Sequence, residues 1–162
     1  KYIIETSNDR FIICIVDDEN LRRQIIDTVS SKDKTFVDKI GFKDCKTDKD
    51  YKEMDNRKAN MNNPEIKNVI FDFLEKFNNN YFFITNYINL NRDIYQRMNK
   101  NIILLMSSKL YIYFLRNSKD FSSFCFKIEF SNINDIYFSS DEFENEYNKD
   151  KEEYRRFVKK LI

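Results

Sequence analysis

Runs of apolar and aromatic residues alternate with polar turns along this chain, and the pattern is densest between residues 81 and 138. Four runs there are rich in β-branched and aromatic side chains, the composition typical of strands. They are residues 81–91, 101–108, 109–117 and 124–139. A polar connection, residues 91–101, separates the first run from the second. The pattern therefore predicts consecutive strands, and because residues 109–117 are apolar on both faces of such a strand, we expect a helix to cover one face.

The N-terminal part of the chain also contains strand-like runs followed by a helical pattern. Residues 2–16 contain two β-rich runs around a polar turn at residues 7–10, which predicts a β-hairpin. Asp17 or Asp18 can then cap a helix, because a short acidic side chain accepts a hydrogen bond from the first helical turn. The apolar residues that follow recur at helical spacing: Leu21, Ile25, Ile26 and Val29.

A polar segment, residues 32–63, separates this unit from the rest of the chain. It interleaves Lys with Asp and contains the single Gly of the sequence, which predicts a linker or long loop. A short ordered patch is expected at its few apolar positions, Phe36, Val37, Ile40 and Phe42.

Two further helices are predicted from cap residues and spacing. Asn63, Pro64 and Glu65 form a helix start, and apolar residues follow at helical spacing from Ile66 to Phe77. Such a stripe is more often a core face than a segment that fills a partner's groove. Residues 139–141 can cap a final helix that carries aromatic residues, with a break possible in its charged middle at residues 148–153.

Length and charge narrow the functional classes. A chain of 162 residues with 41% hydrophobic content supports one core, or one domain with an appendage. The formal net charge of +1 excludes a bulk field that would attract nucleic acid or an anionic membrane, so any electrostatic contact must be a local patch. The Asn-rich and aromatic-rich composition reflects an AT-rich coding bias more than a function.

Chemistry-bearing residues are sparse. With no His, no CxxC pair, no glycine-rich phosphate loop and no nucleophile elbow, the sequence indicates neither an enzyme nor a cofactor. Cys14, Cys45 and Cys125 are an odd, scattered set, expected to be buried reduced thiols. The acidic groups 17–19 and 142–146 fit helix capping and a solvated face better than a cation site. Aromatic strands can stack bases, but the glycine-aromatic signature of sheet-type RNA binders is missing, so no nucleic-acid partner is expected.

The sequence was also searched for targeting and membrane-spanning segments. No signal peptide and no apolar run near the roughly 18 residues of a membrane span occur, so an intracellular location is expected, cytoplasmic or peripheral on the cytoplasmic face of a membrane. The chain begins at Lys1 without Met and ends at Ile162 within a helical pattern, so it is expected to be a piece of a longer protein.

Part of the strand-rich region resembles the first strands of a pleckstrin-homology-like domain, nearest to the tail-homology type of class I myosins. The matching residues are Asn91-Arg92, Gln96-Arg97, Ile102 to Ser107, Leu110-Tyr111 and Ile133 to Ile136. Residues 2–31 resemble the other end of such a domain, so the order of the two ends is reversed. The resemblance implies an α+β fold, a small antiparallel β-sheet or partly open barrel packed by helices. It divides the chain into residues 1–31, a hairpin and helix that either end a preceding module or complete the sheet, the linker 32–63, and residues 64–162.

The same resemblance implies a non-catalytic binding module. The first hypothesis is a scaffold that packs on a neighbouring domain or protein partner through an aromatic sheet face or the predicted helix 66–77. The alternative is a membrane-targeting module for phosphoinositide-type headgroups. The positions that match the family's basic cup are Arg92, Arg97 and Lys100, where cationic donors would hold phosphates by charge-assisted hydrogen bonds.

Sedimentation with liposomes, with and without phosphoinositide, separates the two hypotheses. A headgroup site would make sedimentation depend on phosphoinositide, and replacement of Arg92, Arg97 and Lys100 by Ala would weaken it more than tenfold, since hydrogen bonds to charged groups contribute about 1.5–3 kcal/mol each. The scaffold hypothesis predicts no phosphoinositide dependence. Binding that survives the triple replacement would contradict the headgroup site.

Overall fold

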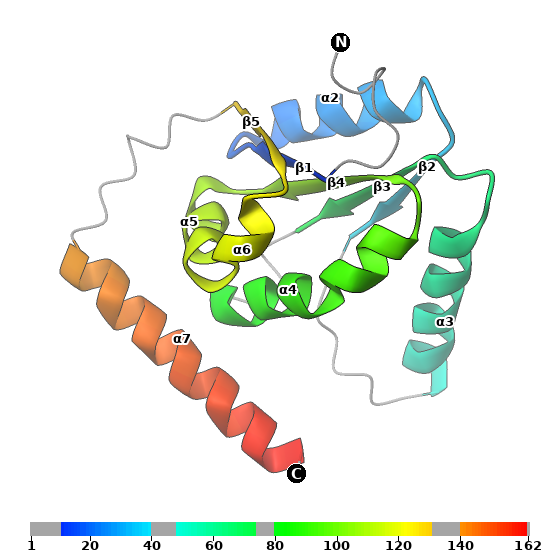
Figure 1. Cartoon of the computed structure of the whole chain (residues 1–162). Helices are drawn as coiled ribbons and strands as arrows, with labels where there is room; N and C mark the ends of the chain where they lie inside the picture. The colour runs from blue at the N-terminus through cyan, green and yellow to red at the C-terminus, as the bar shows by residue number, and fades with distance from the viewer. Residues whose placement is uncertain (1–10, 40–47, 74–79, 131–139, 162) are drawn as a thin grey trace.

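The computed structural model describes residues 11–39, 48–73, 80–130 and 140–161. In these ranges strands and helices alternate along the chain (Figure 1). The strands are β1 (Phe11–Ile15), β2 (Thr35–Asp38), β3 (Asn68–Asp72), β4 (Asn101–Met106) and β5 (Phe126–Glu129). The helices are α2 (Glu19–Ser30), α3 (Asp48–Asn62), α4 (Tyr81–Arg97), α5 (Ser108–Asn117), α6 (Lys119–Ser122) and α7 (Ser140–Leu161).

The five strands form one sheet in the order β2-β3-β4-β1-β5. Every pairing is parallel: Ile13 lies opposite Leu104 of β4 and opposite Lys127 of β5, and Ile70 lies opposite Ile103. A pleckstrin-homology sheet is antiparallel, so the expected antiparallel pleckstrin-homology-like fold is wrong. Parallel neighbours require crossover connections, and here helices supply them.

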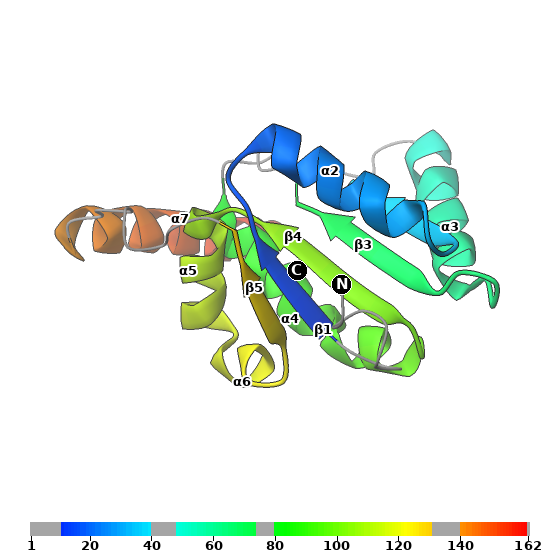
Figure 2. The same ribbon diagram turned by 90° about the horizontal axis from the view of Figure 1, so that it is seen from above.

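The direction of each crossover explains which face each helix covers. From β1 the chain moves three strands to β2, whereas every later connection moves in the opposite direction across the sheet. Because parallel crossovers are right-handed, α2 must lie on one face and the later helices on the other. Figure 1 shows α2 above the sheet, with α4, α5 and α6 below it, and Figure 2, seen from above, shows α2 in front of the strands.

Two apolar cores result, one on each face of the sheet. The core under α2 combines β-strand side chains with Val29 and the partly buried Ile25 and Ile26 of that helix. The larger core, on the opposite face, combines strand residues such as Phe71 with α4, α5 and α6. All five residues of β3 and five of the six in β4 are buried, which is typical of central parallel strands covered on both faces.

Helix α7 packs outside this sandwich, against α4 and α5. Its aromatic residues Phe143, Tyr147 and Tyr154 meet Phe82 of α4 and Tyr113 of α5 in a third apolar cluster. The helix is continuous through its charged middle, residues 148–153, so no break occurs there.

Two of the predicted strands are helices. Residues 81–91 lie in α4, which Asn80 caps by accepting from the Phe83 amide at 3.1 Å. Residues 109–117 lie in α5, which Ser107 caps by accepting from the Leu110 amide at 3.1 Å. In both, the cap and a helical spacing of buried residues override aromatic β-propensity. Most of the expected polar connection 91–101 is the end of α4.

The helix predicted after Pro64 is also wrong, because Asn68–Asp72 form the buried strand β3. A short apolar run fits both the spacing of an amphipathic helix and that of a buried strand. Here pairing with β2 and β4 makes it a strand. The polar segment 32–63 is not only a linker, since it contains β2, where Phe36 and Val37 lie, and α3.

Other predictions are confirmed. Asp18 caps α2 by accepting from the Leu21 amide at 2.7 Å, and β4 and β5 fall in predicted strands. Residues 11–15 form a strand, and β1 lies inside the same sheet, between β4 and β5. The first strand and turn of the expected hairpin, Ile40, Phe42, Cys45 and residues 133–136 lie outside the described residues.

Replacement of Phe71 by Ala tests the larger core. Phe71 is fully buried and its ring lies 4.9 Å from that of Tyr95, so we expect a loss of about 3–5 kcal/mol in the free energy of unfolding. Urea denaturation followed by circular dichroism measures it. Leu90→Ala, at an exposed position of α4, is the matched control and should change stability by no more than about 0.5 kcal/mol. Equal effects of the two variants would contradict this core.

Candidate functional site

The sheet has a topological switch point between β4 and β1. These neighbours are parallel, but the helix after β1 lies on one face and the helix after β4 on the other. In open α/β sheets, ligands bind in the crevice at the carboxyl ends of strands at such a point. Here the switch point lies between Asp17 and Asp18, which follow β1, and Ser107, which follows β4.

An internal contact joins the two strand ends at this switch point. Asp17 Oδ1 accepts a hydrogen bond from the Ser108 amide at 2.9 Å, and its Oδ2 accepts from the Ser108 hydroxyl. The Asp17 carboxylate therefore occupies the N-terminus of α5, the position at which the helix dipole would attract an external anion. Asp18 likewise serves the N-terminus of α2. The N-termini of α5 and α2 are therefore capped by carboxylates of the chain itself.

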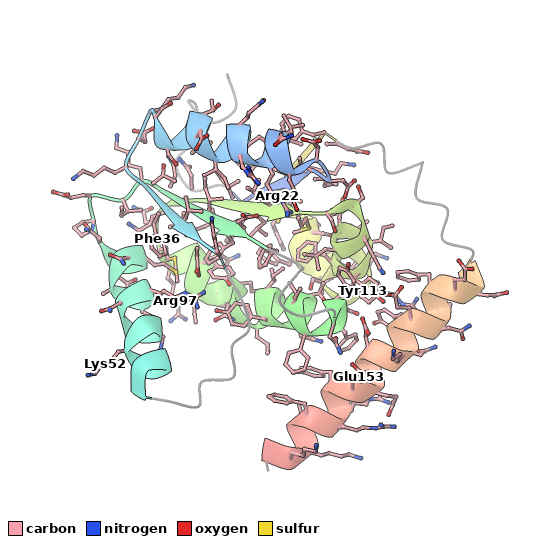
Figure 3. All side chains as sticks on the ribbon, turned by 180° about the vertical axis from the view of Figure 1, so that it is seen from behind. Arg22, Phe36, Lys52, Arg97, Tyr113 and Glu153 are labelled. Carbon is pink, nitrogen blue, oxygen red and sulfur yellow. The ribbon has the colours of Figure 1, made fainter. Side chains whose placement is uncertain are left out.

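A buried ion pair lies under α2 at the same edge of the sheet. Arg22 Nε lies 3.4 Å from Asp72 Oδ1 at the end of β3, and both side chains are largely buried. Among the described residues, neither that carboxylate oxygen nor Arg22 Nε and Nη2 has a hydrogen-bond partner. Burial raises the pKa of Asp72, and the charges of Arg22 and Lys39 oppose this rise. Figure 3 shows Arg22 on α2, directed toward the sheet.

This edge does not assemble a metal site from the described residues. Within the ranges given above, no three His, Cys, Asp or Glu side chains lie close enough to share an ion. The acidic groups considered for cation binding instead have other partners: Glu144 pairs with Arg116, and Glu146 Oε1 lies 2.6 Å from Lys109 Nζ. Glu19 lies 3.8 Å from Arg23 one turn along α2.

The three basic residues expected to form a headgroup site have different surroundings. Arg92 and Arg97 are exposed on α4, five positions apart and so on different sides of the helix, and Arg92 Nε lies 3.4 Å from Asp93. Lys100 is buried, and its ammonium donates to the carbonyl oxygens of Asn63 and Ile66, each at 2.6 Å. Burial lowers the pKa of Lys100. The structure therefore does not gather three exposed cations at one rim.

Exposed aromatic side chains instead gather around β5. Phe124, Phe126 and Phe130 are 70%, 40% and 46% exposed, although they flank or belong to a strand of the sheet. β5 pairs with β1 on one side, and no other described strand pairs with its outer side. The sequence correctly predicted a strand here, but nothing in its pattern distinguishes an edge strand from a central one.

A pocket of about 450 Å³ opens at the N-terminal end of β5, at the amino edge of the sheet. Its walls come from β1, α4, the residue before β4 and the segment that enters β5: Phe11, Tyr95, Gln96, Lys100, Phe124, Cys125 and Phe126. Four of these residues are aromatic and none is acidic. Pockets of about 300–1,000 Å³ with mainly apolar walls are typical of binding sites.

The two described cysteines are free thiols. Burial raises the pKa of Cys14 and of Cys125 to about 12. Because the thiolate is the nucleophile, neither residue fits a catalytic role at neutral pH. Cys125 borders the pocket as a small apolar wall element.

Comparison with known proteins adds no relative: no family model, no curated protein and no solved structure matches the chain. None of the described helices combines the length and the apolar character that crossing a membrane requires.

A double-mutant cycle tests the contact between Asp17 and Ser108 at the switch point. Asp17→Ala should lower the free energy of unfolding by about 1–3 kcal/mol, because the Ser108 amide and hydroxyl lose their acceptor. Ser108→Ala should cost less, about 0.5–1.5 kcal/mol, since its amide still donates. Urea denaturation of the double variant should give less than the sum of the two losses. Additive losses would show that the two side chains do not act as a unit.

Proposed function

We propose that this chain is a non-catalytic protein-interaction module, and that its docking site is the outer edge of β5 with the aromatic pocket at its N-terminal end. One observation carries the proposal: three exposed phenylalanines lie in or beside β5, an edge strand of a parallel sheet. Large apolar side chains gathered on a surface are typical of interaction sites. An edge strand also offers backbone groups to an extended partner segment.

The direction of the backbone groups on β5 supports this mode of binding. The Phe130 amide donates to the Ile15 carbonyl of β1 at 2.9 Å. Successive residues of a strand direct their backbone groups to opposite sides, so the amides of Phe126 and Ile128 also face β1. The amide of Lys127 faces away from β1, toward the side where a partner strand would pair.

Charge and shape at this site favour an apolar or aromatic partner segment. Lys127 Nζ lies 3.2 Å from Glu129 Oε2, so the two charged side chains of β5 compensate each other. In the pocket, the charged head of Lys100 is already bound to two carbonyl oxygens. Aromatic walls without an acid therefore suit an apolar anchor side chain, while the paired backbone supplies affinity.

The balanced charge of the chain and its free thiols are consistent with such a role. A net charge of +1 gives no long-range attraction to nucleic acid or membrane, so contact has to rely on local packing. Two unpaired cysteines fit the reducing interior of a cell, and we place the module there.

Selection from a displayed library of random twelve-residue peptides tests the proposal. We expect selected peptides to be rich in alternating apolar and aromatic residues, because one side of the added strand contacts Phe126 and Ile128. Lys127→Pro should weaken their binding at least tenfold, since it removes the outward amide and leaves the inward amides in place. Fluorescence anisotropy with a labelled selected peptide measures the dissociation constant.

Lys127→Ala is the matched control for that experiment. It removes the same charge and ion pair but keeps the amide, so we expect its affinity to stay within about threefold of the original. Peptides that bind the Pro variant as tightly as the Ala variant would contradict strand addition at β5. A selection that enriches no peptide motif would contradict the interaction module itself.

A further inference from the structure

Helix α7 is held against α4 and α5 by aromatic packing at its centre. Tyr147 lies 5.5 Å from Phe82 and 5.6 Å from Tyr113, measured between ring centroids, and the Tyr147 hydroxyl donates to Asn117 Oδ1. Tyr154, two turns further along, lies 5.4 Å from Phe82. Figure 3 shows Tyr113 of α5 facing α7, and Glu153 on α7. The contact is lateral, because α7 touches helices and contributes nothing to the sheet.

Acidic residues follow one another along the contacting side of α7, and their partners differ. Glu144 pairs in a fork with Arg116, whose hydrogen bonds and charge lower the pKa of Glu144. Glu146 pairs with Lys109 at 2.6 Å. Asp150, one turn after Glu146, is only 5% exposed and forms no ion pair with any described residue.

The surroundings of Asp150 come from all three helices. On α4, Asn80 Nδ2 donates to the Asp150 carbonyl at 3.1 Å and to Glu153 Oε2 at 3.2 Å, and the Tyr81 backbone hydrogen-bonds the carboxyl group. On α5, the fully buried Tyr113 side chain faces the carboxyl, and Lys109 is engaged with Glu146. On α7 itself, Glu146 and Glu153 flank it. In the part of the chain that the structure describes, Asp150 Oδ2 has no hydrogen-bond partner.

We infer that Asp150 is a proton-linked clasp, which holds α7 on α4 and α5 when its carboxyl group is neutral and weakens the contact when the group is ionised. An ionised carboxylate at this position is buried beside two other acids and has one oxygen unpaired. A neutral carboxylic acid carries no net charge and can donate a hydrogen bond. The inference goes beyond peptide binding at β5, since it concerns another part of the molecule.

The sign of the effect follows from the causes of the pKa shift. Burial raises the pKa of Asp150 above its ordinary value, and the charges of Glu146 and Glu153 raise it further. The Tyr113 side chain and the Tyr81 backbone, which face the carboxyl group, lower it without reversing the direction. In released α7, the carboxyl would titrate at its ordinary pKa of about 3.9. Docking is therefore strongest below that pH, weakens as the pH rises to the pKa of the docked group, and is constant above it.

Hydrogen exchange of the α7 amides, measured by mass spectrometry from pH 4.5 to pH 8, tests the clasp. After correction for intrinsic exchange rates, we expect protection of residues 141–160 to fall as the pH rises, by up to tenfold per pH unit within the sensitive window. Protection of β4 should be unaffected, because the described packing of α7 is on α4 and α5. Asp150→Asn should make the protection of α7 independent of pH and at least as high at pH 8 as in the original chain.

Two further variants keep the test decisive. Asp141→Asn, at an exposed position of the same helix, should leave the pH dependence unchanged. Glu153→Gln removes one of the neighbouring charges and should move the fall in protection to lower pH, even if the Asp150 variant folds poorly. Protection of α7 that is flat or rises with pH in the original chain would overturn the clasp. So would an Asp150→Asn variant whose α7 is less protected at every pH, since Asp150 would then act as an anionic cap of α4.

Discussion

The apolar character of both faces of the central strands is the constraint on which this structure depends. β3, β4 and β1 present Val, Ile, Leu and Phe side chains to both sides of the sheet, and almost all of them are completely buried. Such a sheet cannot leave either face in water, so it needs a layer of helices on each side. Parallel pairing meets this need, because each crossover places a helix on a face.

The single long connection from β1 to β2 determines where everything else lies. It places α2 on one face and the later described helices on the other, where α4, α5 and α6 share the larger core. It also brings β1 to a position between β4 and β5, so the sheet ends on one side in β5, a short strand with exposed aromatic neighbours. The switch point and the exposed edge thus have one topological cause.

The two ends of the sheet differ in their chemistry. At the carboxyl edge, polar side chains have partners within the chain: Asp17 accepts hydrogen bonds from Ser108, Arg22 forms an ion pair with Asp72, and Arg57 lies 2.6 Å from Asp38. At the amino edge and along β5, apolar side chains remain exposed and a pocket is open. Apolar groups that stay in contact with water lose the stabilisation that burial would provide. This contrast favours a site for a protein partner at β5 over a catalytic crevice at the switch point.

The sequence by itself determined the elements for which cap residues, apolar spacing and residue propensity all indicate the same secondary structure. The α2 helix follows from the Asp18 cap and the spacing of its apolar residues, and β4 from an uninterrupted aliphatic run. Local signals conflicted in residues 81–91 and 109–117, where aromatic side chains favour a strand but Asn80 and Ser107 cap helices. They conflicted again at Asn68–Asp72, where helical spacing hid a strand. Tertiary structure decided these cases, since a run that is apolar on every side becomes strand or helix according to the neighbours that bury it. Parallel pairing, the exposed edge of β5 and the burial of Lys100 and Asp150 all depend on contacts between residues far apart in the chain, which no local pattern records.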